Sequence, residues 1–290
     1  MKKFKVPYEM LLLKLICFIT AIVSGFSGRF STPEELLELG DNALSSDDVT
    51  TAIKFYLRGI EGIDDDESIL TALSLYTNLG TSYSSMGEEV KAIEMYRNAI
   101  LYYSDTIGEI VDKTILKSAS DLAAQTSFFL GLSHQEIGNS QKAVDAYAYA
   151  NTLDPFHWAS LANLGSVLHD NLKEPADALA VYNKAFHILT QTEVEPTDVP
   201  EDPKLILSQL QYRIGLCITY SENQKCVMQD DPTKEVACTE MAANAFSQAI
   251  ELDPENEIAK HMLATVTADA SMSRASNAYV TKLFEDYAEE

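Results

Sequence analysis

Basic residues are scarce in this chain. Of its 290 residues, 44 are Asp or Glu and only 21 are Lys or Arg, which gives a formal net charge of −23 at pH 7. DNA, RNA and anionic lipids are bound by basic faces, so this composition argues against all three as partners. It fits a protein or peptide partner, including a basic one. The alternative is that the acidic surface only keeps the protein soluble.

Motifs for catalysis and for cofactor binding are missing as well. The sequence has no G-x-G-x-x-G, no G-x(4)-G-K, no H-E-x-x-H and no G-x-S-x-G. The five histidines are scattered along the chain, and no Cys/His spacing is typical of zinc. We therefore expect no catalytic residue, no cofactor and no metal site, and a protein that is not an enzyme.

Cysteine is also rare, with four residues in the chain. Cys226 and Cys238 lie 12 positions apart in a segment without a regular pattern. In an oxidising compartment a disulfide between them would close this loop and stabilise it by about 2–3 kcal/mol. In the cytosol they would be ordinary thiols.

What the chain does contain is a repeated pattern of small and aromatic residues. Gly131 and Gly165 each follow a Leu and lie 34 residues apart. Each is followed by an Ala, by a Tyr four positions later and by another Ala three positions after that. Five stretches carry versions of the pattern, and their small residues are Gly40, Ala52, Gly80, Ala92, Gly131, Ala143, Gly165, Ala178, Gly215 and Ala242.

This pattern and its period resemble the tetratricopeptide repeat (TPR), in which each unit is a pair of antiparallel helices, A and B. The resemblance implies that the Gly of helix A and the Ala of helix B lie where the two helices touch. It places the aromatic residue between one pair and the next. One unit cannot bury its apolar face alone, so the units stack. We expect an all-α TPR superhelical solenoid over residues 33–269, with about five repeats and a capping helix.

The spacing of the glycines predicts where extra residues enter. The intervals between successive repeats exceed 34 residues near 107–123 and 191–207, and the fifth repeat has an excess inside it near 221–237. Insertions in solenoids map to loops on one face or edge. The fourth unit has one extra residue, which we expect in its turn.

The TPR resemblance also implies a binding groove lined by helix A. TPR domains that bind the acidic C-termini of chaperones use a clamp of Lys, Asn and Arg there, but Arg213 is the only clear cation among the candidates. We therefore expect no carboxylate clamp, and instead an extended peptide or a helix held by polar and aromatic contacts. The alternative is that these residues only support the solenoid. The candidates are Asn78, Thr81, Phe128, Gln135, Asn163, His169, Tyr212, Arg213 and Tyr220.

The first 25 residues differ from the rest. Lysines at the start are followed by an apolar stretch and then by small residues, which is typical of a secretory signal peptide. The stretch is short for a membrane span. We expect the secretory pathway or the extracellular space, with membrane contact only through this leader. An uncleaved anchor, plastid import and a cytoplasmic location are the alternatives.

The last segment, residues 273–290, departs from the repeat pattern. Residues 278–290 resemble the linker of TPR-containing methyltransferases that use S-adenosylmethionine. That family continues into a strand and a Gly-rich loop, and neither is present in this sequence. The resemblance implies, as an alternative function, the substrate-recruiting front of such an enzyme. The segment would otherwise be an amphipathic capping helix.

Overall fold

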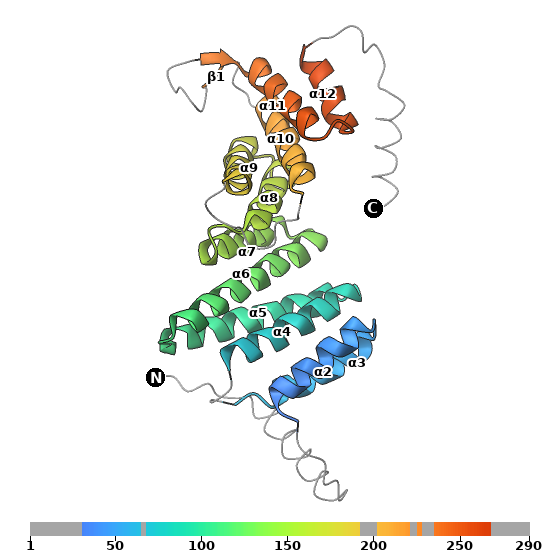
Figure 1. Ribbon diagram of the computed structural model, residues 1–290, viewed down its shortest axis with the longest axis vertical. Coiled ribbons are helices and arrows are strands. Elements are labelled where there is room, and N and C mark those ends of the chain that lie inside the picture. The colour runs from blue at the N-terminus through green and yellow to red at the C-terminus, as the bar shows by residue number, and fades with distance from the viewer. Residues whose placement is uncertain (1–30, 65–67, 192–201, 221–224, 228–234, 268–290) are drawn as a thin grey trace, which may run out of the picture.

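The computed structural model describes residues 31–64, 68–191, 202–220, 225–227 and 235–267 (Figure 1). The leader expected at 1–25 and the linker expected at 273–290 lie outside these ranges. Every long element within them is a helix, so the all-α expectation is confirmed.

The helices form successive pairs, and we number these pairs as repeats one to five. The pairs are α2 (Pro33–Ser45) with α3 (Val49–Glu61), α4 (Ile69–Ser85) with α5 (Glu89–Thr106), α6 (Lys113–Glu136) with α7 (Ser140–Leu153), α8 (Trp158–Ser166) with α9 (Pro175–Thr190), and α10 (Lys204–Thr219) with α11 (Cys238–Leu252). A last helix, α12 (Glu257–Thr267), packs on α11. Figure 1 shows the pairs stacked along the long axis, from α2 and α3 at one end to α12 at the other.

Local sequence explains where several of these helices begin. Thr32 and Glu35 form a capping box at the start of α2, with each side chain accepting a hydrogen bond from the backbone N–H of the other. Asp48 accepts a hydrogen bond from the Thr51 N–H at the start of α3. Asp112 does the same for two N–H groups at the start of α6. These side chains satisfy donors that have no partner inside the helix.

Each repeat is closed by an aromatic ring that lies on the glycine of its own helix pair. A Cβ atom added to Gly165 would lie 2.7 Å from the ring of Tyr182, which is well inside the normal carbon–carbon contact distance of about 3.5 Å. Gly40, Gly80, Gly131 and Gly215 are covered in the same way by Tyr56, Tyr96, Tyr147 and Phe246. The expectation that the aromatic residue fills the space between pairs was incomplete. The ring packs first within its own pair, and it also joins a core cluster with the next one.

The sequence predicts the extra residue of repeat four in its turn. The structure places it in helix A instead. In repeats one, two and three, the residue with positive φ in the A–B turn comes seven positions after the glycine, as Asp47, Gly87 and Gly138. In repeat four it comes eight positions after Gly165, at Lys173. The additional residue is taken up in η2 (Val167–Asn171), a π-helix that continues α8. A π-turn accommodates one more residue than an α-turn.

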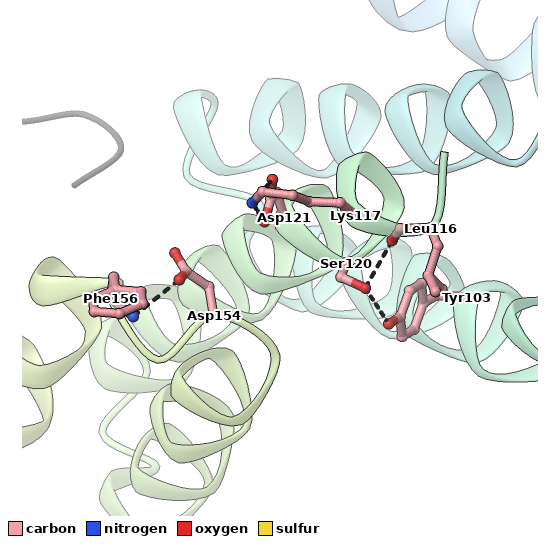
Figure 2. A network of polar contacts seen from close by, with 7 residues as sticks. All are labelled: Tyr103, Leu116, Lys117, Ser120, Asp121, Asp154 and Phe156. Atoms are coloured by element: carbon pink, nitrogen blue, oxygen red, sulfur yellow. Dashed lines mark hydrogen bonds and ion pairs between the residues drawn. The ribbon is translucent and has the colours of Figure 1, made fainter. Parts of the chain in front are cut away.

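The insertion near 107–123 is mostly helical, which corrects the expectation of a loop. It contains the short η1 (Ile107–Glu109) and the first turns of α6. Figure 2 shows how these turns are held: the hydroxyls of Tyr103 and Ser120 lie 2.9 Å apart, and Ser120 also donates to the carbonyl of Leu116. The added residues therefore lengthen the α5–α6 contact.

The other two insertions are described in part. Within 191–207, residues 192–201 lie outside the described ranges and α10 begins at Lys204. Within 221–237, β1 (Lys225–Val227) and β2 (Glu235–Ala237) pair as a small antiparallel hairpin before α11. Cys238 is engaged in a disulfide bond. The side chain of Cys226, its expected partner, is not among those described, so this pairing stays a prediction.

Candidate functional site

The A helices of neighbouring repeats meet through the predicted groove positions. Asn78 on α4 donates to Asp41 on α2 across 2.8 Å. Arg213 on α10 donates to Asp170 in η2 across 2.7 Å. These contacts join α2 to α4 and η2 to α10, each through one predicted groove residue. We use the term row for the predicted groove positions along the A helices.

In repeat two, the predicted groove residues form hydrogen bonds within the solenoid itself. Asp41 accepts hydrogen bonds from both Asn78 and the hydroxyl of Tyr56, the latter at 2.7 Å. Thr81 donates to its own helix and accepts from the Tyr96 hydroxyl at 3.3 Å. Burial raises the pKa of Tyr96 to about 12. One amide N–H of Asn78 and the hydroxyl of Thr81 therefore take part in contacts within the solenoid.

Repeat three repeats this arrangement with different side chains. The hydroxyl of Tyr147 donates to Gln135 Oε1 at 3.0 Å. The ring of Phe128 lies 5.9 Å from that of Tyr147 and 5.2 Å from that of His157, between centroids. Phe128 and Gln135 thus support the stack, which was the alternative reading for groove residues.

In repeats four and five, Tyr220 is the most exposed of the predicted groove residues. It is 61% exposed, and its ring lies 5.7 Å from that of His169, whose side chain is 14% exposed. Asn163 is half-buried and donates to the carbonyl of Ala159 in its own helix. Tyr212 is half-buried against Phe246. The Tyr220 ring is therefore the largest solvent-facing surface among these residues.

A charged network lies in the same part of the row, and Asp170 is its centre. Asp170 Oδ1 lies 2.6 Å from His169 Nδ1, while Oδ2 accepts from Arg213 at 2.7 Å and from the Ser166 hydroxyl at 3.1 Å. Burial acts to raise the pKa of Asp170, but the His169 hydrogen bond and the charge of Arg213 outweigh it and hold the pKa below its usual range. Asp170 is therefore a carboxylate, and it neutralises Arg213.

Tyr182 lies beneath this network. The residue is 2% exposed, and its hydroxyl has no hydrogen-bond partner. Burial raises the pKa of this hydroxyl well above its ordinary value, although the nearby charge of Arg213 acts in the opposite direction. An unpaired buried hydroxyl is costly, so this position differs from the satisfied tyrosines of repeats one to three.

Sequence reasoning missed two residues that form hydrogen bonds along the row: Asp41 and Asp170. A usable signal existed for the first, because Asp41 directly follows the repeat glycine, as Thr81 and Ser166 do. A polar residue there lies near the tyrosine of helix B. The signal for Asp170 was the additional residue between Gly165 and the turn, which had been assigned to the wrong place.

The remaining described surface offers little that resembles a second site. A shallow cavity of about 310 Å³ lies at the start of α6, lined by Lys113, Thr114, Lys117, Ser118 and Asp121. Within the described ranges, no group of three or more His, Cys, Asp or Glu side chains could hold a metal ion. No described helix is long and apolar enough to cross a membrane.

Comparison with known proteins agrees with the fold of repeated helix pairs. Residues 73–106, which include most of α4 and all of α5, match the tetratricopeptide repeat family model. No curated protein sequence matches the chain.

Solved structures share the fold at low sequence identity. YrrB, described as a TPR protein with an unusual peptide-binding site, is 16% identical with a TM-score of 0.53, over 83% of this chain and 95% of YrrB. A tetratricopeptide repeat protein from Parabacteroides merdae is 18% identical with a TM-score of 0.51, over 87% of this chain and 79% of that protein. MamA is 19% identical with a TM-score of 0.51, over 75% of this chain and 95% of MamA. The chain therefore has a fold of stacked helix pairs like that of tetratricopeptide repeat proteins, and residues 73–106 match the repeat itself.

Proposed function

We propose that the chain is a non-catalytic scaffold or adaptor that binds an extended protein segment along α8, η2 and α10. TPR folds commonly bind proteins, and a peptide-binding site is part of the description of YrrB. The observation that carries the proposal is the difference between the two halves of the row. The candidate side chains Asn78, Thr81 and Gln135 of repeats two and three form hydrogen bonds within the solenoid, whereas the ring of Tyr220 is 61% exposed.

The chemistry of this open part suits an extended peptide. Asn163 Oδ1 and His169 Nε2 can each form a hydrogen bond with a peptide backbone or side chain. The exposed Tyr220 ring offers a rigid apolar surface that loses little conformational entropy on binding, which is the reason tyrosine is common at binding sites.

Panning of the purified full-length chain against a random peptide library displayed on phage tests this proposal. We expect enrichment of peptides that bind in fluorescence anisotropy with micromolar dissociation constants. Tyr220→Ala and Asn163→Ala should each weaken binding by about tenfold, as expected for central contacts of an interface.

Glu94→Ala is the matched control, because Glu94 is exposed on α5, outside the row. Its affinity for the same peptides should equal that of the wild type. Enriched peptides that bind the Tyr220→Ala protein as tightly as the wild type would place the binding surface elsewhere. A lack of any enrichment over heat-unfolded protein would argue against peptide binding itself.

We further propose that the leader directs the chain into the secretory pathway. The support is its sequence pattern of lysines, an apolar stretch and small residues. N-terminal sequencing of the protein produced in its own cells tests this: a mature chain that begins after residue 25 is expected, and a chain that retains the leader would contradict cleavage.

A further inference from the structure

Arg213 holds a special position in the row of groove residues. In the described A helices, it is the only Arg or Lys among the predicted groove residues. A guanidinium group presents five N–H donors in a planar fork that matches a carboxylate. In a groove of this kind, a free Arg213 would be the point at which the ligand's negative charge is recognised.

The structure supplies that negative charge from inside the chain. Asp170 lies 2.7 Å from Arg213 Nη1 and is held from its other side by His169 and Ser166. Three donors thus fix one carboxylate, and its pKa is lowered as a result. The pair links repeat four to repeat five across the open part of the row.

The π-helix explains how Asp170 reaches this place. One additional residue in a helix rotates everything after it by about 100° relative to the preceding turns. Asp170 lies within the π-helix, whereas repeats one to three continue as α-helix up to their turns. The buried Tyr182 hydroxyl lies close to the charges of Arg213 and Asp170 at the same turn.

We propose that Asp170 is an internal counter-ion that occupies the ligand position of Arg213, so that the open groove selects peptide segments without carboxylates. The inference rests on the proposed function and adds the charge class of the ligand. An acidic segment has to displace Asp170 from three hydrogen bonds or lie beside it as a like charge. Both alternatives cost free energy, and specificity often arises from such a repulsive element.

The net charge of the protein also disfavours the binding of acidic segments. At −23, the chain repels an acidic ligand before contact. This long-range repulsion is screened by salt, whereas the occupation of Arg213 by Asp170 is a short-range contact that salt affects much less. Binding measured at high salt therefore isolates the contribution of the pair.

The test uses full-length protein and two labelled synthetic peptides at high salt. One peptide ends in several Glu and Asp residues with a free carboxylate, and the other has Gln and Asn in their place and an amidated end. We expect wild-type protein to bind the acidic peptide much more weakly than the neutral one. Asp170→Asn should bind the acidic peptide about tenfold more tightly than the wild type, since one charged hydrogen bond becomes available.

Asp121→Asn is the matched control. Asp121 is paired with Lys117 at 2.8 Å on α6, so this change also removes one carboxylate and frees one cation, but in repeat three and away from Arg213 and Asp170. It should leave the affinity for the acidic peptide unchanged. Circular dichroism melting of each variant verifies that the fold is retained.

Two results would overturn the inference. The first is an unchanged affinity of Asp170→Asn for the acidic peptide, and the second is an equal gain in Asp121→Asn. Either one leaves the proposed function standing if library peptides still bind the wild type. Conversely, a gain in affinity for the acidic peptide that occurs in Asp170→Asn alone supports the internal counter-ion, whether or not the phage library yields binding peptides.

Discussion

At the scale of single residues, the repeat depends on contacts between a glycine and a ring. The sequence predicted both partners, because a small residue and an aromatic residue recur at constant spacing. It did not predict what the ring hydroxyls bind. Tyr56 uses Asp41, Tyr147 uses Gln135, and Tyr182 has no partner. Such partners depend on side-chain geometry across two helices, and the pattern of small and aromatic residues carries no information on that geometry.

His134 shows what an atypical residue at a packing position does. It stands where other repeats place an aromatic or apolar side chain, it is 7% exposed, and its Nδ1 atom has no partner. Burial lowers its pKa from 6.5, and the charges of Lys142 and Arg97 lower it further, against a smaller opposite effect of Asp145. His134 is therefore neutral in the folded protein at pH 7.

The free energy of unfolding should consequently depend on pH through this residue. Well above pH 6.5, His134 is neutral in both states and contributes nothing to the pH dependence. As the pH falls below 6.5, the unfolded chain takes up the proton first, so stability falls, by at most about 1.4 kcal/mol per pH unit. Urea denaturation of wild type and His134→Tyr between pH 7.5 and pH 5 measures this. A decline of equal slope in both proteins would show that other groups are responsible.

At the scale of elements, the turn between helices A and B is the constant part of the repeat. Its residue with positive φ is Asp47, Gly87, Gly138 or Lys173 in repeats one to four. Sequence spacing predicted that repeat four has one residue too many. It could not say where, because a π-turn and a longer turn both accommodate one residue. Which of the two forms depends on which one lets the ring of Tyr182 pack on Gly165.

The effect of a substitution in the A–B turn on stability should depend on the backbone φ angle at that position. Gly138 has φ of +73° with no atom near the position of a Cβ, so Gly138→Ala meets only the backbone penalty and should lose about 1 kcal/mol. The reciprocal Asp47→Gly, at φ of 61°, should gain about 0.5 kcal/mol. Chemical denaturation of both variants measures whether the free energy of unfolding rises or falls. A loss in both would mean that Asp47 contributes a contact which outweighs its strained backbone.

At the scale of the whole molecule, the stack and the acidic charge were both visible in the sequence, but the shape of the insertions was not. The segment 107–123 is mostly helical, its Ala119 and Ala123 pack in one buried cluster with Tyr103, and Ser120 lies in hydrogen-bond contact with the Tyr103 hydroxyl. The sequence places the candidate groove residues on the A helices, and their role in binding stays a prediction. It could not tell residues that face a ligand from those that join repeats, because both are polar or aromatic at the same positions.

Stability of the whole chain should increase with salt. The net charge of −23 opposes compaction through self-repulsion, which salt screens. Salt also weakens ion pairs, but those described, such as Lys117–Asp121 and Lys260–Glu257, are largely at the surface and contribute little. The melting temperature is therefore expected to rise between low and physiological sodium chloride concentrations. A fall would show that the ion pairs outweigh the repulsion.

The π-helix of repeat four has a consequence at the level of the gene. Its additional residue corresponds to a single codon between those for Gly165 and Lys173. An insertion of this size keeps the reading frame, leaves Arg213 untouched and still rearranges the groups around it. Repeat genes that arise by duplication can therefore diverge in ligand preference through the gain or loss of one codon, without any substitution at the residue that would contact the ligand.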